Sequence, residues 1–174
     1  MTSSSDTIYT TNILDANNNI VYSEQETRHI YVWGGYALQS KIVDPNGLAL
    51  TSSNTYYENL SEAGRYGRLK SELRPDDSWT VYDYDDQGRK SLEITPWKDS
   101  EFGSTAAQAK AVAYAYAPVD TADTLELNDQ RPRTVTESIL GVATKKTFYV
   151  YKTVNGERVE IEERAATPAA SRLR

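Results

Sequence analysis

The chain has 174 residues, a formal net charge of −6 and no cysteine. This length fits one domain, the acidic balance argues against nucleic acid as a partner, and the lack of thiols excludes disulfides and cysteine-based zinc sites. Tyrosine dominates the large aromatic side chains, with 13 Tyr against 2 Phe, which is typical of a sheet packed on one face and wet on the other.

The first residues show no sign of a targeting segment. Met1–Asp6 has no basic start and no long apolar run, so we expect no signal peptide. No segment approaches the roughly 20 apolar residues of a membrane helix, so we also expect no membrane span. Such a chain either leaves the cell without a cleaved signal or is a piece of something longer.

The first third of the chain carries weak hairpin signals. Leu14–Tyr22 has a polar turn between two apolar arms, and we expect Ile30–Trp33 to pair beside it. Gly34 and Gly35 predict a turn or bulge. Asp44–Gly47 predicts a turn because proline stands at its second position.

The middle of the chain contains an internal repeat. A Gly-Arg pair is followed by an alternating segment and then by proline, and the two Gly-Arg pairs stand 21 residues apart. The repeat-defining residues are Gly67, Arg68 and Pro75 in the first copy, and Gly88, Arg89 and Pro96 in the second. Glycine supplies a turn conformation and proline ends a ladder, so each copy predicts a strand entered by a turn.

The two copies predict a strand followed by a β-hairpin. In the first copy, Leu69–Leu73 alternates apolar and polar side chains, as a half-buried strand does. Trp79–Tyr84 predicts a strand, Asp85–Gly88 a tight turn and Arg89–Thr95 the returning strand. The clearest repeats therefore span residues 56–97.

An alanine-rich segment breaks the strand pattern. Glu101–Val112 contains Ser104 and Thr105, either of which is placed as a helix cap. We expect either one short helix near residues 104–113 or a loop. The whole segment 98–130 is interpreted as an insertion or irregular region.

The final third returns to strand signals. Tyr114–Tyr116 leads, after the insertion, into Arg133–Glu137. A last hairpin is predicted over residues 147–163, because an Asn-Gly turn stands between two alternating segments. Residues 164–174 are rich in Ala, Pro and Ser and predict a tail.

The segment from Tyr82 to Arg89 closely resembles the YD repeat of bacterial Rhs proteins and animal teneurins. The residues that define the repeat are Tyr82, Tyr84, Gly88, Arg89 and Pro96, with Gly67, Arg68 and Pro75 in the preceding copy. Leu14–Asn19 and Val43–Gly47 look like degenerate copies. The resemblance implies an all-β fold, in which antiparallel hairpins form a curved or spiralling sheet strip, with residues 1–174 as a single repeat module.

The resemblance also implies a function. Such strips form hollow shells that, in the family, often enclose a toxic C-terminal domain. We therefore expect a non-enzymatic structural module, a segment of a shell or scaffold in a larger secreted or injected bacterial protein. Its expected partners are other segments of a longer repeat protein, a second copy through sheet edges, or an enclosed toxin domain.

One short motif has two interpretations. Asp44–Leu48 matches the five-residue Asp-Pro-x-Gly-Leu motif found where such shells cleave themselves. Here the motif stands near the N-terminus, with repeats after it and without the arginine- and tyrosine-rich context that precedes it in the family. We interpret it as an ordinary turn.

Candidate chemistry is sparse. Asp83–Gly88 resembles the start of a calcium loop, but Ile94 stands where the bidentate glutamate is needed. Carboxylate pairs for glycoside hydrolysis recur with the repeat, as a solvated face would. His29 is the only histidine, and we expect it at an edge or surface. We therefore expect no catalytic residue, no cofactor and no metal.

Tryptophan provides the best binding candidates. Trp33, Trp79 and Trp97 either stack on sugar rings or pack the sheet, where cross-strand aromatic pairs contribute roughly 0.2–1 kcal/mol each. We favour packing. A carbohydrate-binding or adhesin module remains the alternative function, and a glycan-active enzyme the second alternative.

Overall fold

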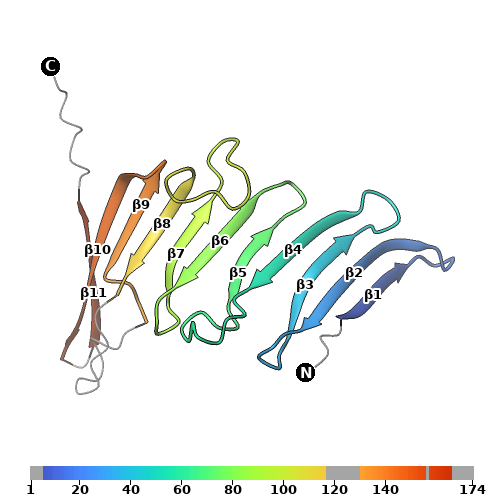
Figure 1. Ribbon diagram of the computed structural model, residues 1–174, viewed down its shortest axis with the longest axis horizontal. Helices are drawn as coiled ribbons and strands as arrows, with labels where there is room; N and C mark the ends of the chain where they lie inside the picture. The colour runs from blue at the N-terminus through green and yellow to red at the C-terminus, as the bar shows by residue number, and fades with distance from the viewer. Residues whose placement is uncertain (1–5, 117–129, 156, 166–174) are drawn as a thin grey trace. The chain divides into compact units, whose positions relative to one another are not determined.

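The computed structural model describes residues 6–116, 130–155 and 157–165. The described chain is all-β and antiparallel, which confirms the predicted fold class (Figure 1). It divides into two compact units, one of Met1–Tyr82 with Asp86–Gly88, the other of Asp83–Asp85 with Arg89–Arg174. The described part holds no helix of the length and hydrophobicity that crossing a membrane needs.

The first unit is built from strands that hydrogen-bond in the order of the chain. They are β1 (Asp6–Leu14), β2 (Ile20–Ile30), β3 (Tyr36–Val43), β4 (Leu50–Tyr56), β5 (Leu69–Leu73) and β6 (Trp79–Tyr84), the last two residues of which belong to the second unit. The predicted strands over Leu69–Leu73 and Trp79–Tyr84 are found with those bounds. In β5, Ser71 is buried and Lys70 exposed, as the alternation predicts.

The second unit is also ordered along the chain. Its strands are β7 (Lys90–Thr95), β8 (Lys110–Ala115), β9 (Thr134–Ile139), β10 (Val142–Val154) and β11 (Glu157–Ala165). The predicted last hairpin corresponds to β10 and β11, which pair in register from Val154 opposite Glu157 to Lys146 opposite Ala165. Parts of the predicted insertion and tail, residues 117–129 and 166–174, lie outside the described residues.

The helix expected near residues 104–113 is not formed. Residues 98–109 make turns, and Lys110–Ala115 is strand β8, paired with β7 on one side and β9 on the other. Ala111 lies opposite both Ile94 and Ser138 and is 2% exposed. A small side chain fits this crowded position, so hydrogen bonding and packing on both sides override the helix propensity of alanine.

Ile30–Trp33 also differs from its prediction. Ile30 ends β2, and the residues after it form the turn between β2 and β3 instead of a strand. The Tyr31 amide donates to the Gly35 carbonyl (3.1 Å), and the Gly34 amide donates to the Tyr31 carbonyl (2.8 Å). The two glycines therefore serve the turn that was predicted for them, and the turn reaches back to Tyr31.

The same hairpin turn recurs along the chain. In Asp15–Asn19, Tyr31–Gly35 and Arg74–Ser78, the first residue donates its amide to the fifth carbonyl, and the fourth amide returns to the first carbonyl. Asp85–Arg89 shares the first of these bonds, at 2.9 Å. The fourth residue has a positive φ in all four turns: Asn18, Gly34, Asp77 and Gly88. This is the three-residue hairpin loop with a left-handed fourth position, which suits Gly, Asn and Asp.

The buried core is thin. Few large side chains of the described residues are fully covered, and they are distributed over strands and turns of each unit rather than gathered in one cluster. The buried hydrophobic residues are Tyr31, Trp79, Ile94, Ala109, Ala111 and Tyr151. Tyrosine and tryptophan thus supply half of these buried hydrophobic residues.

Candidate functional site

Within the described residues, the hydroxyls of several tyrosines bond to backbone that is distant in sequence. Each hydroxyl donates to a carbonyl that lies 18 to 26 residues away in sequence. The bonds run from Tyr56 to Leu38 (3.0 Å), Tyr57 to Tyr82 (2.8 Å), Tyr116 to Lys90 (2.8 Å) and Tyr151 to Pro132 (3.1 Å). We call Tyr56, Tyr57, Tyr116 and Tyr151 the anchored tyrosines. Each packs a ring and satisfies a backbone acceptor at the same time.

Arginine side chains lie over three of the anchored tyrosines: Arg65 over Tyr57 at 5.9 Å, and others over Tyr116 and Tyr151. The Arg89 guanidinium lies 4.4 Å from the Tyr116 ring centroid, and Arg131 and Arg133 lie 3.6 and 4.9 Å from that of Tyr151. These are cation–π distances. Burial raises the pKa of the Tyr116 hydroxyl, and the nearby Asp85 carboxylate adds to that rise.

Arg89 is held on its other side by the acidic turn. Its Nε donates to Asp85 Oδ2 (2.8 Å), and its backbone amide donates to Asp85 Oδ1 (2.9 Å). The side chain of Arg89 is only 9% exposed. Both oxygens of Asp85 therefore serve the turn and the arginine. Over the described residues, no group of three or more His, Asp or Glu side chains is placed to hold a metal ion.

The first Gly-Arg pair contacts the second. A Cβ built on Gly88 would collide with the Arg68 guanidinium, so Arg68 lies directly against the glycine. Arg68 Nε also donates to the Gly64 carbonyl (2.9 Å), which fixes its direction. Gly88 has φ +74 and is buried. The glycine is needed here for its conformation and for the room that its missing side chain leaves.

The two residues of the second Gly-Arg pair thus have different structural roles. Gly88 receives the arginine of the preceding copy, whereas Arg89 turns toward Asp85 and Tyr116. Sequence reasoning identified these residues as repeat-defining but missed Tyr116 and Asp85 as partners. The available signal was the spacing of Tyr-x-Tyr pairs, which recur at Tyr82, Tyr114 and Tyr149.

Trp33 belongs to an aromatic cluster at the turn between β2 and β3. Its ring is stacked on Tyr31 with centroids 4.4 Å apart and an interplanar angle of 3°. Tyr66 meets it edge-on at 5.9 Å, and Gly67 lies against the same ring system. These contacts leave Trp33 half-buried.

The other two tryptophans differ in exposure. Trp79 is 2% exposed, so neither face of its ring is open to a sugar. Trp97 follows Pro96 in the loop after β7 and is half-buried. The arrangement of Trp33 and Trp79 favours packing over sugar stacking.

His29 lies on β2 at a partly exposed position. Its Nδ1 pairs with the carboxylate of Asp6 on β1, and its ring meets Tyr31 edge-on at 4.6 Å. This contact links β1 and β2, in which Asp6 and His29 are directly opposite each other.

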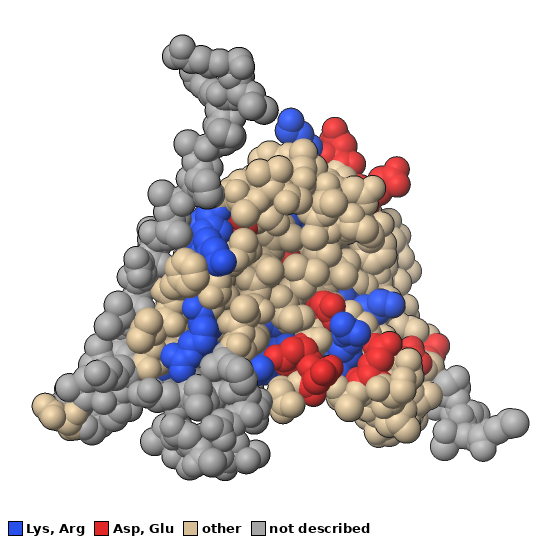
Figure 2. All heavy atoms as spheres, turned by 60° about the vertical axis from the view of Figure 1, so that its left-hand side comes forward, with Lys and Arg blue, Asp and Glu red and all other residues tan. Residues whose placement is uncertain are grey.

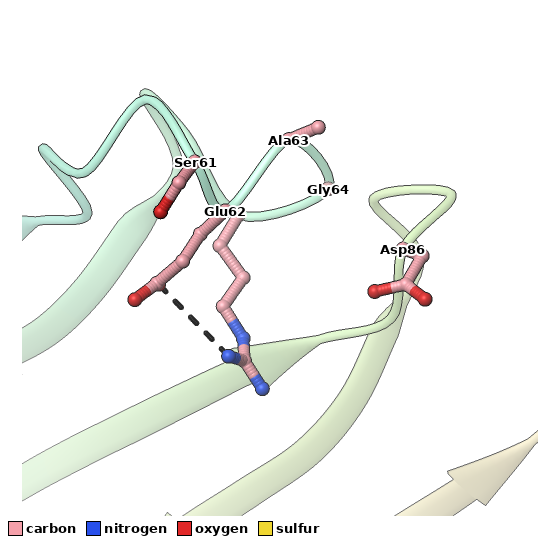
Figure 3. Close-up of a pocket in the computed structure, with 6 residues that line it drawn as sticks. Ser61, Glu62, Ala63, Gly64 and Asp86 are labelled. Carbon is pink, nitrogen blue, oxygen red and sulfur yellow. Dashed lines mark ion pairs between the residues drawn. The ribbon is translucent and has the colours of Figure 1, made fainter.

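A small hollow lies beside the loop between β4 and β5. It has a volume of about 330 Å³ and is lined by Ser61, Glu62, Ala63, Gly64, Arg65 and Asp86. Figure 3 shows Glu62 and Asp86 on two different loops at its margin. Glu62 pairs with Arg65 at 3.9 Å, and Arg65 lies 5.9 Å from the Tyr57 ring. Glu62 and Arg65 therefore pair with each other, and Arg65 also lies over an anchored tyrosine.

Charged side chains are interleaved in sign. Figure 2 shows acidic and basic residues close together along the lower part of the face that it draws. On β2 and β3, Lys41 pairs with Glu24 (2.7 Å) and lies 3.8 Å from Glu26, which also pairs with Arg28 (3.0 Å). Such alternating charges keep a sheet face in contact with water and create no electrostatic potential of a single sign.

Comparisons with known proteins do not extend these findings. No protein-family model matches the chain, and no curated protein matches it in sequence.

Proposed function

We propose that this chain is a structural, non-enzymatic wall segment of the YD-repeat type, within a larger secreted or injected protein. The observation that carries the proposal is the contact of Arg68 with Gly88, through which one Gly-Arg repeat is packed on the next. A repeat protein gains its stability from such neighbour contacts, because a single repeat cannot bury its own apolar face.

The recurrent turn supports the same proposal. Four hairpin turns share a left-handed fourth residue, and consecutive strands pair with their neighbours in chain order within each unit. Each hairpin can then be added to the last without a long crossover. This arrangement suits a wall that grows along the chain.

The anchored tyrosines also fit a structural role. Their hydroxyls donate to backbone carbonyls, and arginine side chains lie over the rings of Tyr57, Tyr116 and Tyr151, so both the polar and the apolar parts of these side chains are used within the protein. A wall without a covering helix layer needs side chains of this kind, because each must pack on one side and meet water on the other.

Imaging of the natural gene product by electron microscopy tests the proposal. We expect the strands of each unit to lie in a β-sheet wall whose hairpins continue into neighbouring repeats. The proposal is overturned if the chain forms a separate domain that shares no strand ladder with the rest of the protein. Catalytic turnover by the purified chain, or glycan binding that Trp97→Ala removes, would support the alternative functions instead.

A further inference from the structure

We propose that Asn46 is a site of spontaneous chemical modification, at which the side-chain amide is lost through a cyclic succinimide. This inference is independent of the proposed wall function. It starts from the turn between β3 and β4, which carries the dipeptide Asn46-Gly47.

The chemistry needs only the chain and water. The backbone nitrogen of Gly47 attacks the Cγ of Asn46, forming an N–Cγ bond, while the Cγ–Nδ2 bond breaks and ammonia leaves with the proton of the amide. Water then opens the ring at one of its two carbonyls. The products are aspartate or isoaspartate, and the latter adds one backbone atom to the turn.

The neighbour of Asn46 permits this attack. Gly47 has no Cβ, so its nitrogen is the least crowded nucleophile that a peptide offers. The space beside it is already filled by the Asp44 carboxylate, against which a Cβ on Gly47 would collide. A larger residue at this place would have to displace that carboxylate, which accepts the Leu48 amide in the turn.

Asn46 is exposed, and its side chain makes no hydrogen bond within the described residues. It lines a hollow of about 440 Å³ together with Ile20, Val21, Tyr22, Ser23 and Asp44. Water can reach the amide and ammonia can leave. Other asparagine amides are held: Asn19 Nδ2 donates to Asp15 (3.0 Å), Asn54 Nδ2 to the Leu38 carbonyl (3.2 Å) and Asn59 Nδ2 to Glu62 (3.3 Å).

The Asp44 carboxylate controls how freely the turn can open. Its Oδ2 accepts the Leu48 amide (3.0 Å), and its backbone carbonyl accepts the amides of Gly47 (3.0 Å) and Ala49 (2.9 Å). The Gly47 nitrogen can therefore attack only after its hydrogen bond to the Asp44 backbone carbonyl breaks. Removing the carboxylate loosens the turn and is expected to speed the reaction at Asn46.

Peptide mapping of the folded full chain tests the proposal. The protein is incubated in heavy-oxygen water at mildly alkaline pH, and aliquots are digested and sequenced by mass spectrometry. We expect heavy oxygen and isoaspartate to accumulate at Asn46 several-fold faster than at Asn54 or Asn59, which the same tryptic peptide contains. Asn46→Gln should abolish the signal at this position and leave the other two unchanged.

A matched variant distinguishes the effect of the turn on the reaction rate from the intrinsic reactivity of the Asn-Gly dipeptide. Asp44→Ala should raise the rate at Asn46 severalfold without changing the rate at Asn54, while circular dichroism checks that the sheet is retained. Equal rates at Asn46, Asn54 and Asn59 in the folded chain, or modification of Asn46 only after unfolding in urea, would overturn the proposal. An unchanged or slower rate in Asp44→Ala would overturn the role of the carboxylate in restraining the turn.

Discussion

At the scale of single residues, tyrosine performs two tasks that would otherwise need two side chains. The ring of each anchored tyrosine packs within its unit, and its hydroxyl donates to a backbone carbonyl 18 to 26 residues away in the chain. Phenylalanine could supply only the packing, and serine only the hydrogen bond. This double use accounts for four of the 13 tyrosines in the sequence.

Ionisation of Tyr31 should lower the free energy of unfolding at alkaline pH. It is 6% exposed, and burial followed by repulsion from Tyr56, Glu58 and Asp6 raises its pKa from 10.0 to about 12. Its stabilising effect is therefore complete below pH 10 and is lost as the pH rises through about 12, because the unfolded chain ionises first. The urea midpoint of the parent should fall in this window.

Tyr31→Phe tests that dependence directly. The variant keeps the ring that stacks on Trp33 and removes the ionisable group. Its urea midpoint should match that of the parent at neutral pH and fall less steeply above pH 10. Parallel curves for the two proteins over the whole window would contradict the assignment.

Comparing substitutions at Gly88 and Gly34 tests the contact between the two Gly-Arg repeats. Both occupy the left-handed fourth position of the hairpin turn, at φ +74 and +79. Gly34→Ala adds a methyl group in open space and should cost about 1–2 kcal/mol for the backbone conformation alone. Gly88→Ala should cost more, because the methyl group also displaces the Arg68 guanidinium.

Chemical denaturation of both glycine variants measures the difference. A larger loss in Gly88→Ala, which shrinks when Arg68→Ala is added, would identify the arginine as the cause. Equal losses in the two single variants would show that the repeat contact contributes nothing beyond the turn.

At the scale of elements, β1 is an edge strand with exposed apolar side chains. Ile8, Tyr9, Ile13 and Leu14 are each more than half exposed, and β1 contains no proline, glycine or lysine. Strand edges without such residues are prone to pair with another chain. We expect the isolated chain to gain mass with concentration in sedimentation velocity experiments.

Thr10→Lys should reduce this association, because it places a charge in the middle of β1. Leu60→Lys is the control: Leu60 is 73% exposed but lies in the loop between β4 and β5. A parent chain that stays monomeric at every concentration, or an equal effect of both lysines, would exclude β1 as the contact.

At the scale of the whole molecule, the chain consists of two compact units with thin cores. All eleven of the described regular elements are strands. The far-ultraviolet circular dichroism spectrum of the full chain should therefore be dominated by β-structure and should lack the double minimum of helices. A helical spectrum would contradict both the fold and the wall proposal.

The sequence by itself determined the features that depend on near neighbours. Period-two alternation predicted β5 and β6, and polar or glycine-containing segments predicted the turns within Leu14–Tyr22 and at Gly34-Gly35, because these preferences act within about five residues of the chain. The tight turn at Asp85–Gly88 and the last hairpin were predictable for the same reason.

Only the tertiary structure decided what depends on residues far apart in the chain. Ala111 is in a strand because Ile94 and Ser138 flank it, although its local sequence favours a helix. Arg68 reaches Gly88, and Tyr116 reaches Lys90, across spans that no local pattern encodes. Pairing and packing between strands set these contacts, because their free energy outweighs the small propensity of any single residue.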